Sequence, residues 1–430
     1  MKSISQRTVC ADTLWEGAHE SGLRVFVYPK AHFSSSYALF GTRYGSIDNV
    51  FRRAGDAAFT EVPAGIAHYL EHKLFENEDE DAFARYARTG ANANAYTSFE
   101  KTCYLFSCTK HFTESLEILL DFVQKPYFTP ETVQKEQGII AQEIRMGDDD
   151  PDSKVFWNLL KAMYRNHPVR IDIAGTVESI AQIDADLLYS CYRTFYHPSN
   201  MVLCAEGNVN PDEVFALVDR MVPAQPAPAV ERQFPAEPAA VVQARVTDTA
   251  PVAAPLFTIG FKESADVRPT DAECAATDVL LQVLASDTSP LYRRLMAGGW
   301  INDSFSAEYF EGSGYAAVLF GGESRDPDYV AAEIVREADR FRREGIDPES
   351  FECASRALYG SAESGIGSVS LLANRMADAA LSGRTFGAEP ELLRAMTVQQ
   401  VQDRLAVQLL PDRMAISVVN PLESTNQQEG

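Results

Sequence analysis

The chain has 430 residues, 46% hydrophobic and 23% charged, as expected for a globular protein with a substantial core. Its formal net charge of −23 argues against nucleic acid or anionic membranes as partners, because both are themselves negatively charged. The sequence contains no apolar run near the roughly 20 residues that span a bilayer and no apolar stretch typical of a signal peptide, so we expect a cytoplasmic protein with reduced cysteines.

Hydrophobic periodicity indicates that both halves of the chain mix strands and helices. Apolar residues alternate, or form short runs, where strands are predicted, and they recur every three to four residues where helices are predicted. In chain order, the predicted elements are strands at 23–28 and 37–44, a helix at 112–123, strands at 256–261 and 315–320, and a helix at 330–341.

A proline-rich stretch divides the sequence. Residues 222–238 contain five prolines and no periodic pattern, which predicts a semi-rigid linker between domains at 1–221 and 239–430. The halves resemble each other, because a helix followed by Pro-x-x-Met and a strand occurs in both, with Met201 and Met414 lying 213 residues apart. We therefore predict an α+β fold of two similar domains, each a mixed sheet with helices, related by internal duplication.

The sequence GIAHYLEH at 65–72 contains two of the seven histidines. His68 and His72 are four residues apart, so on a helix both imidazoles lie on one face and can reach a single metal ion. Glu71 lies beside them, close enough to hold a metal-bound water. A helix is predicted here because apolar residues recur at helical spacing: Ile66, Leu70 and Leu74.

A catalytic zinc site needs a third protein ligand besides the two histidines. Candidates lie on a second predicted helix, 130–146, where Glu136 and Glu143 are seven residues and thus two turns apart. Both carboxylates point the same way, so spacing alone does not choose between them. Carboxylates on exposed helix faces are also common without any metal.

These motifs together resemble the insulinase/pitrilysin family (M16-type) of zinc metallopeptidases, which carry an inverted H-x-x-E-H motif. The resemblance rests on HYLEH followed by E-x6-E in KEQGIIAQE, and it spans nearly the whole chain. Further matching stretches are RYGSIDN at 43–49, GANANAYT at 90–97, EKTCY at 100–104, HP at 167–168, GT at 175–176 and YHPSNM at 196–201.

The resemblance implies one Zn²⁺ per chain, with His68, His72 and Glu143 as its ligands. Glu71 is then the general base acting on a zinc-bound water, and Glu136 steadies the site without binding metal. The second domain is expected to lack a metal site. The implied activity is hydrolysis of peptides by a zinc-dependent endopeptidase or oligopeptidase inside a closed chamber.

The resemblance also implies a substrate-binding strand. In the family, the segment matching 92–96 is an edge strand that adds substrate backbone to the sheet. The residues expected to contact substrate are Asn92, Asn94, Ala95 and Tyr96, and the small side chains among them allow another backbone to approach.

The second half departs from the family pattern. The family carries an Arg and a Tyr, seven residues apart, that reach the substrate, whereas this chain has Met296 and Asp303 at those positions. An acidic side chain cannot stabilise a developing oxyanion as a phenol does. Arg293, Arg294 and Tyr309 are near in sequence, but helix-face charge and strand packing explain them better.

The absence of this Arg and Tyr predicts a partner subunit that supplies them. Half-length family members work in pairs, and in unlike pairs one subunit bears zinc while the other supplies the Arg and Tyr. We expect the zinc-bearing member of such a bacterial heterodimer, with a self-sufficient homodimer as the weaker expectation. Two alternatives are a non-catalytic assembly subunit, disfavoured because the zinc motif is complete, and a structural zinc, which would need a fourth protein ligand.

Overall fold

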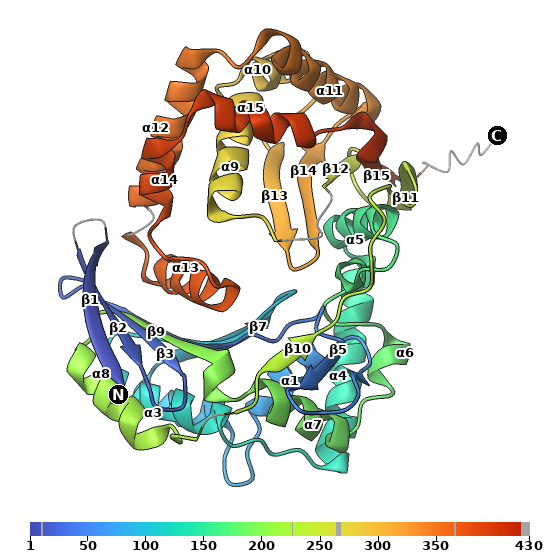
Figure 1. The fold of residues 1–430 in the computed structure, drawn as a ribbon. Coiled ribbons are helices and arrows are strands. Elements are labelled where there is room, and N and C mark those ends of the chain that lie inside the picture. The colour runs from blue at the N-terminus through green and yellow to red at the C-terminus, as the bar shows by residue number, and fades with distance from the viewer. Residues whose placement is uncertain (10–11, 226, 264–267, 365–366, 423–430) are drawn as a thin grey trace. The chain divides into compact units, whose positions relative to one another are not determined.

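The computed structural model describes residues 1–9, 12–225, 227–263, 268–364 and 367–422 (Figure 1). The chain forms two compact units. Unit 1 comprises Met1–Ile144, Asp172–Gln233 and Ala362–Ala388, and unit 2 comprises Arg145–Ile171, Phe234–Ser361 and Glu389–Gly430. Of the features predicted from sequence, Cys10, Pro226 of the linker and the last eight residues lie outside the described residues.

Unit 1 contains a seven-stranded sheet in the order β1-β2-β3-β9-β4-β8-β7. Its strands are β1 (Ser3–Val9), β2 (Asp12–Ala18), β3 (Arg24–Pro29), β4 (Ser36–Thr42), β7 (Asn92–Thr97), β8 (Thr102–Cys108) and β9 (Met201–Gly207). The β3–β9 pair is parallel and the remaining pairs are antiparallel, so the sheet is mixed. A small sheet joins β10 (Val230–Arg232), β5 (Val50–Arg53) and β6 (Thr60–Glu61).

Helices cover both faces of the large sheet. One face packs against the main core of unit 1, which includes α1 (Ile66–Leu74), α2 (Ala82–Thr89), α3 (Phe112–Val123), α4 (Pro130–Asp149), α6 (Val177–Ile180), α7 (Ala185–Phe195) and α8 (Pro211–Met221). The opposite face packs against α13 (Val369–Ser382). All seven residues of β4 and of β9 are buried, because these central strands have apolar neighbours on both sides.

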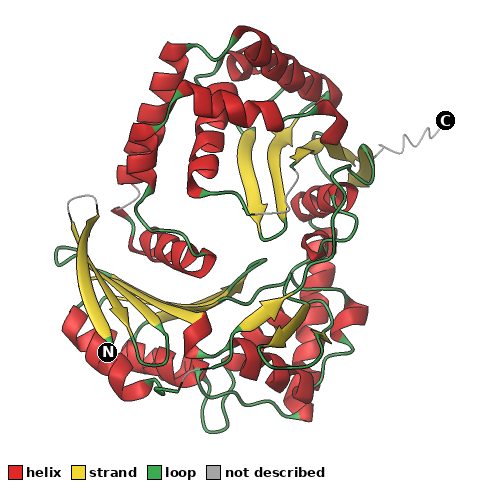
Figure 2. Cartoon of the chain, in the orientation of Figure 1, coloured by secondary structure: helices red, strands yellow, loops and turns green. Residues whose placement is uncertain are grey.

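Unit 2 has a five-stranded sheet in the order β11-β15-β12-β14-β13. Its strands are β11 (Arg245–Ala250), β12 (Leu256–Lys262), β13 (Ser306–Gly312), β14 (Tyr315–Glu323) and β15 (Met414–Pro421). Its helices are α5 (Pro151–Met163), α9 (Asp271–Ala285), α10 (Pro290–Ala297), α11 (Pro327–Glu344), α12 (Pro348–Ser364), α14 (Glu389–Ala395) and α15 (Val398–Val407). Figure 2 distinguishes the helices and strands of both units.

Each unit takes one helix from the other half of the sequence. Helix α5 belongs to the first half but packs on β11, β12 and β15 of unit 2, and α13 belongs to the second half but packs on β4 and β9 of unit 1. The physical reason is that each sheet has a second apolar face that requires a cover. The predicted boundaries at 1–221, 222–238 and 239–430 therefore divide the sequence, whereas the units in space differ from them by this exchange.

The predicted linker also contains ordered structure. Strand β10 lies within 222–238 and pairs antiparallel with β5, and its Arg232 forms an ion pair with the buried Asp48 at 2.8 Å. This end of the linker is thus part of unit 1. Proline enrichment did not indicate the strand, because its three residues fall between the prolines.

The α+β class and the mixed sheets predicted from sequence are confirmed, and every predicted strand and helix overlaps an observed one within a few residues. In the described part of the chain, no helix is both long enough and apolar enough to cross a membrane. The six described cysteines are free thiols, four of them buried.

Candidate metal centre

The start of α1 is fixed by a close backbone approach. Gly65 has a φ of +90°, and a Cβ at this position would collide with the carbonyl oxygen of Ala174. Gly175, with a φ of +77°, leaves equally little room beside the carbonyl of Ala64, which accepts a hydrogen bond from Ser179 Oγ at 2.8 Å. Glycines are required at both positions because only they combine positive φ with this proximity. The GT stretch at 175–176 thereby holds the helix that carries both histidines.

The apolar stripe of α1 brings α4 alongside it. Ile66, Leu70 and Leu74 are buried as predicted, and the core that contains them includes Val133 and Ile140 of α4. The hydroxyl of Tyr69 donates to the carbonyl oxygen of Val133. Helix α4 continues to residue 149, three residues beyond the predicted end. The polar face of α1 is therefore held opposite the carboxylates of α4.

Three donor groups converge between these helices. The Nε2 atoms of His68 and His72 lie 3.6 and 3.4 Å from the carboxylate oxygens of Glu143, and one ligand atom from each residue lies within 4.8 Å of the others. Tetrahedral zinc with ligand bonds near 2.05 Å has ligand–ligand edges of about 3.4 Å. The spacing and the donor types of this group therefore fit a zinc ion. The two imidazole rings, with centroids 4.6 Å apart, come from one face of α1 as the i, i+4 spacing predicted.

The two carboxylates of α4 contact different nitrogens of one imidazole. Glu136 Oε1 lies 2.9 Å from His72 Nδ1, and Glu143 faces His72 Nε2. Glu143 belongs to the three-donor group and Glu136 does not, so the geometry favours Glu143 of the two carboxylates that spacing left open. Glu136 is 8% exposed, and its hydrogen bond with His72 holds the pKa of its carboxyl below the ordinary value.

Electrostatics favour a neutral imidazole at His68. Burial lowers the pKa of His68 to about 4, assisted by the neighbouring His72, with Glu136 opposing the shift. A metal ligand must offer a lone pair, so a ring that stays uncharged at neutral pH is ready to bind. At His72, burial lowers the pKa, but the hydrogen bond to Glu136 and the nearby carboxylates outweigh it and leave the pKa raised.

Glu71 is held by a residue that the sequence did not single out. Thr97 Oγ1 donates to Glu71 Oε2 at 2.7 Å. Burial raises the pKa of Glu71, while the bond from Thr97 and the proximity of His72 oppose the rise. The sequence predicts substrate contacts for residues 92–96 of this strand but gives no role to Thr97, because no sequence signal distinguishes a threonine that contacts a residue 26 positions away.

Strand β7 lies at the edge of the unit 1 sheet, with β8 as its single strand neighbour in the described residues. Asn92 and Asn94 are exposed, whereas Ala95 is half-buried and packs against the core. The hydroxyl of Tyr96 donates to Asn374 Oδ1 on α13, so its side chain is engaged within unit 1. The backbone of β7 and the two asparagines are the parts of this strand that another chain can reach.

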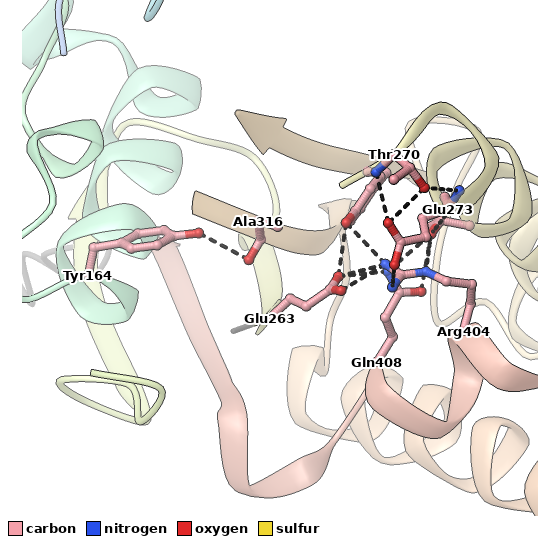
Figure 3. Close-up of polar contacts among 9 residues, drawn as sticks. Tyr164, Glu263, Thr270, Glu273, Ala316, Arg404 and Gln408 are labelled. Carbon is pink, nitrogen blue, oxygen red and sulfur yellow. Dashed lines mark hydrogen bonds and ion pairs between the residues drawn. The ribbon is translucent and has the colours of Figure 1, made fainter. Parts of the chain in front are cut away.

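Arg294 and Tyr309, two of the residues considered as replacements for the family's Arg and Tyr, have partners of their own within unit 2. Arg294 forms an ion pair with Glu337 at 2.8 Å. Tyr309 donates to Glu263 at 2.9 Å and accepts from Arg404 at 3.1 Å. Figure 3 shows the ion pair between Glu263 and Arg404 in the same cluster. These contacts agree with helix-face charge and strand packing.

Two protein-family models match the chain. The model for insulinase (peptidase family M16) matches residues 50–177, and the model for the peptidase M16 inactive domain matches residues 182–358. The first match contains the three-donor group. The second covers much of unit 2, in which the described residues contain no comparable group.

Relatives and solved structures extend the similarity to nearly the full length. The uncharacterized zinc protease YmfH of Bacillus subtilis is 38% identical over 418 residues, 95% of this chain and 97% of that protein. An M16-like peptidase from Alicyclobacillus acidocaldarius has a TM-score of 0.91 at 37% identity, covering 97% of this chain and 99% of that one. Pitrilysin shares the fold, with a TM-score of 0.76 at 14% identity, and this chain matches 46% of its length. The chain therefore belongs to the insulinase family, peptidase family M16, and is a zinc metalloprotease of that family.

Proposed function

We propose that the chain is a zinc-dependent endopeptidase or oligopeptidase that hydrolyses peptides, with Glu71 as the general base. The observation that carries the proposal is the convergence of His68, His72 and Glu143, beside which Glu71 lies on the same turn of α1. Two imidazole donors and one carboxylate leave a fourth coordination position open, as catalytic zinc sites do.

In this proposal His68, His72 and Glu143 hold the zinc, one ion per chain. When bound, zinc would polarise the substrate carbonyl and acidify the attacking water. Glu71 accepts the proton of that water and delivers it to the leaving amine, a transfer that suits a carboxylate with a raised pKa. Glu136 orients His72 through its Nδ1 and keeps Nε2 turned toward Glu143.

Substrate binds, we propose, by adding a strand to β7. Asn92 and Asn94 are exposed at the sheet edge and supply hydrogen-bonding side chains, while Ala95 leaves room for a second backbone. The side chain of Tyr96 is turned toward Asn374, so this residue contributes its backbone. Extended peptides, or locally unfolded segments that fit a closed chamber, are the substrates this mode accepts.

A companion subunit completes the site in this proposal. Met296 is exposed and apolar and Asp303 is acidic, so neither replaces the Arg and Tyr that bind substrate in the family. An unlike M16-type partner is favoured over a second copy, because a copy would repeat the same deficiency.

Hydrolysis of a mixed quenched-peptide library tests the proposal. The zinc-loaded chain is compared with Glu71→Gln, which preserves size and removes the base. Cleavage that disappears in Glu71→Gln indicates a self-sufficient peptidase. If the chain binds zinc but cleaves no peptide, the same assay is repeated with the chain and its co-purified partner. Absence of cleavage in that complex would favour a non-catalytic assembly subunit. Hydrolysis that needs no metal would refute the scheme.

A further inference from the structure

Thr97 occupies the position where the proposed substrate strand meets the proposed base. It is the last residue of β7, and its hydroxyl donates to Glu71 Oε2 at 2.7 Å. The backbone of Thr97 also forms a hydrogen bond with this carboxyl, and both bonds lower its pKa. Thr97 thus fixes the carboxylate of Glu71 through Oε2.

The conformation of Thr97 is itself set by its surroundings. Thr97 lies directly opposite Thr102 in the β7–β8 register, with the two hydroxyl oxygens 3.4 Å apart. Thr102 is fully buried and donates to the carbonyl oxygen of Tyr44 at 2.9 Å. Since Thr102 donates to Tyr44, its oxygen can act only as an acceptor toward Thr97, and the shorter contact of 2.7 Å directs the Thr97 proton to Glu71. A β-branched side chain in a strand also has few χ1 rotamers, which limits reorientation.

We propose that Thr97 is a positioning residue that fixes the carboxylate of Glu71 for catalysis and couples it to the edge strand that receives substrate. The inference rests on the proposed function. A carboxylate on a flexible side chain samples several rotamers, and a positioned hydroxyl donor such as that of half-buried Thr97 selects one of them. Since that donor ends β7, movement of the strand when substrate adds to it is transmitted directly to the base.

The test compares Thr97→Val, which keeps the β-branched shape and removes the donor, with Thr97→Ser, which keeps the donor. Loss of a residue that orients a catalytic or metal-binding side chain without itself touching substrate or metal typically lowers activity by about 10- to 100-fold. We expect kcat to fall by about that factor in Thr97→Val with KM within about twofold, and Thr97→Ser to recover kcat to within about threefold. Zinc content should stay at one ion per chain in both variants. Thr13→Val, on β2 of the same sheet, is the matched control and should leave all three quantities unchanged.

A second measurement is independent of turnover. In the metal-free chain, Thr97→Val should lower the melting temperature when Glu71 is present and have no further effect in a Glu71→Ala background. Equal decreases in both backgrounds would overturn the contact, and equal kcat in Thr97→Val and Thr97→Ser would overturn its role in positioning. These results are distinguishable from failure of the proposed function, in which Glu71→Gln would be as active as the unmodified chain. If the chain alone is inactive, the kinetic comparison is made with its co-purified partner.

Discussion

Glu206, a carboxyl buried between the unit 1 sheet and helix α13, should make the stability of the fold depend on pH. It lies on β9, opposite Tyr28 and Tyr37, on the sheet face that α13 covers. Its side chain is fully buried, and neither carboxylate oxygen has a hydrogen-bond partner among the described residues. Burial raises the pKa of Glu206 from its ordinary value of 4.5 to about 9, although Lys30 opposes the shift. The group is therefore neutral in the folded chain at pH 7.

The sign of the pH dependence follows from proton counts. Between the two pKa values the folded chain keeps the proton of Glu206 and the unfolded chain has lost it, so stability falls as the pH rises. From pH 5 to pH 8 a shift of this size amounts to about 4 kcal/mol of lost unfolding free energy, as an upper figure. Glu206→Gln removes this titration while keeping the shape of the side chain.

We therefore expect Glu206→Gln to be about as stable as the unmodified chain at pH 5 and clearly more stable at pH 8. Thermal melting at several pH values measures the difference, with Glu61→Gln on the exposed strand β6 as the control that should not change it. Parallel pH profiles for Glu206→Gln and the unmodified chain would refute the reasoning, because they would mean that the carboxyl is ionised or solvated in the fold.

Three other predictions concern the metal group and the linker. Glu143→Gln should weaken zinc affinity by at least about 100-fold, measured in competition with a chelator. Glu136→Gln should lower turnover more than zinc content, because Glu136 acts through His72. Greater zinc loss in Glu136→Gln than in Glu143→Gln would contradict the ligand assignment. Removing zinc should abolish hydrolysis and re-adding it should restore turnover, and activity that survives chelation would contradict a metal mechanism. Arg232→Ala leaves Asp48 buried without its ion-pair partner and should cost about 3–5 kcal/mol of unfolding free energy. The control Arg88→Ala, in an exposed ion pair, should cost at most about 1 kcal/mol. Equal losses would show that the ion pair between Arg232 and Asp48 does not anchor the linker strand.

Local sequence patterns were sufficient to predict the helices and strands and to place the two histidines of the three-donor group together. The stripe of Ile66, Leu70 and Leu74 predicted a helix, and that helix places His68 and His72 side by side because the i, i+4 relation is a property of the helix alone. The two helices had to be brought together before Glu136 and Glu143 could be distinguished. That distinction depends on how α4 is rotated against α1, which the sequence spacing does not contain.

The sequence could not predict the exchange of α5 and α13 between the two units, for a related reason. Each helix has the apolar residues of a packed helix, but nothing in its periodicity says which of two similar sheets it covers. Internal duplication makes both sheets acceptable. The proline-rich segment then suggests a boundary where the chain crosses between units, although the exchanged helices cross as well.

The exchange matters for the site because α13 reaches the strand that carries Thr97. Asn374 accepts the hydroxyl proton of Tyr96, and Asp378 forms an ion pair with Lys101, just after β7. A helix from the second half of the sequence thus braces the edge strand of unit 1, which in turn holds Glu71. An enzyme built from residues 1–221 alone would keep His68, His72 and Glu143 but lose this brace. If Glu71 is the base as proposed, its position therefore depends on more of the chain than the position of the three-donor group does.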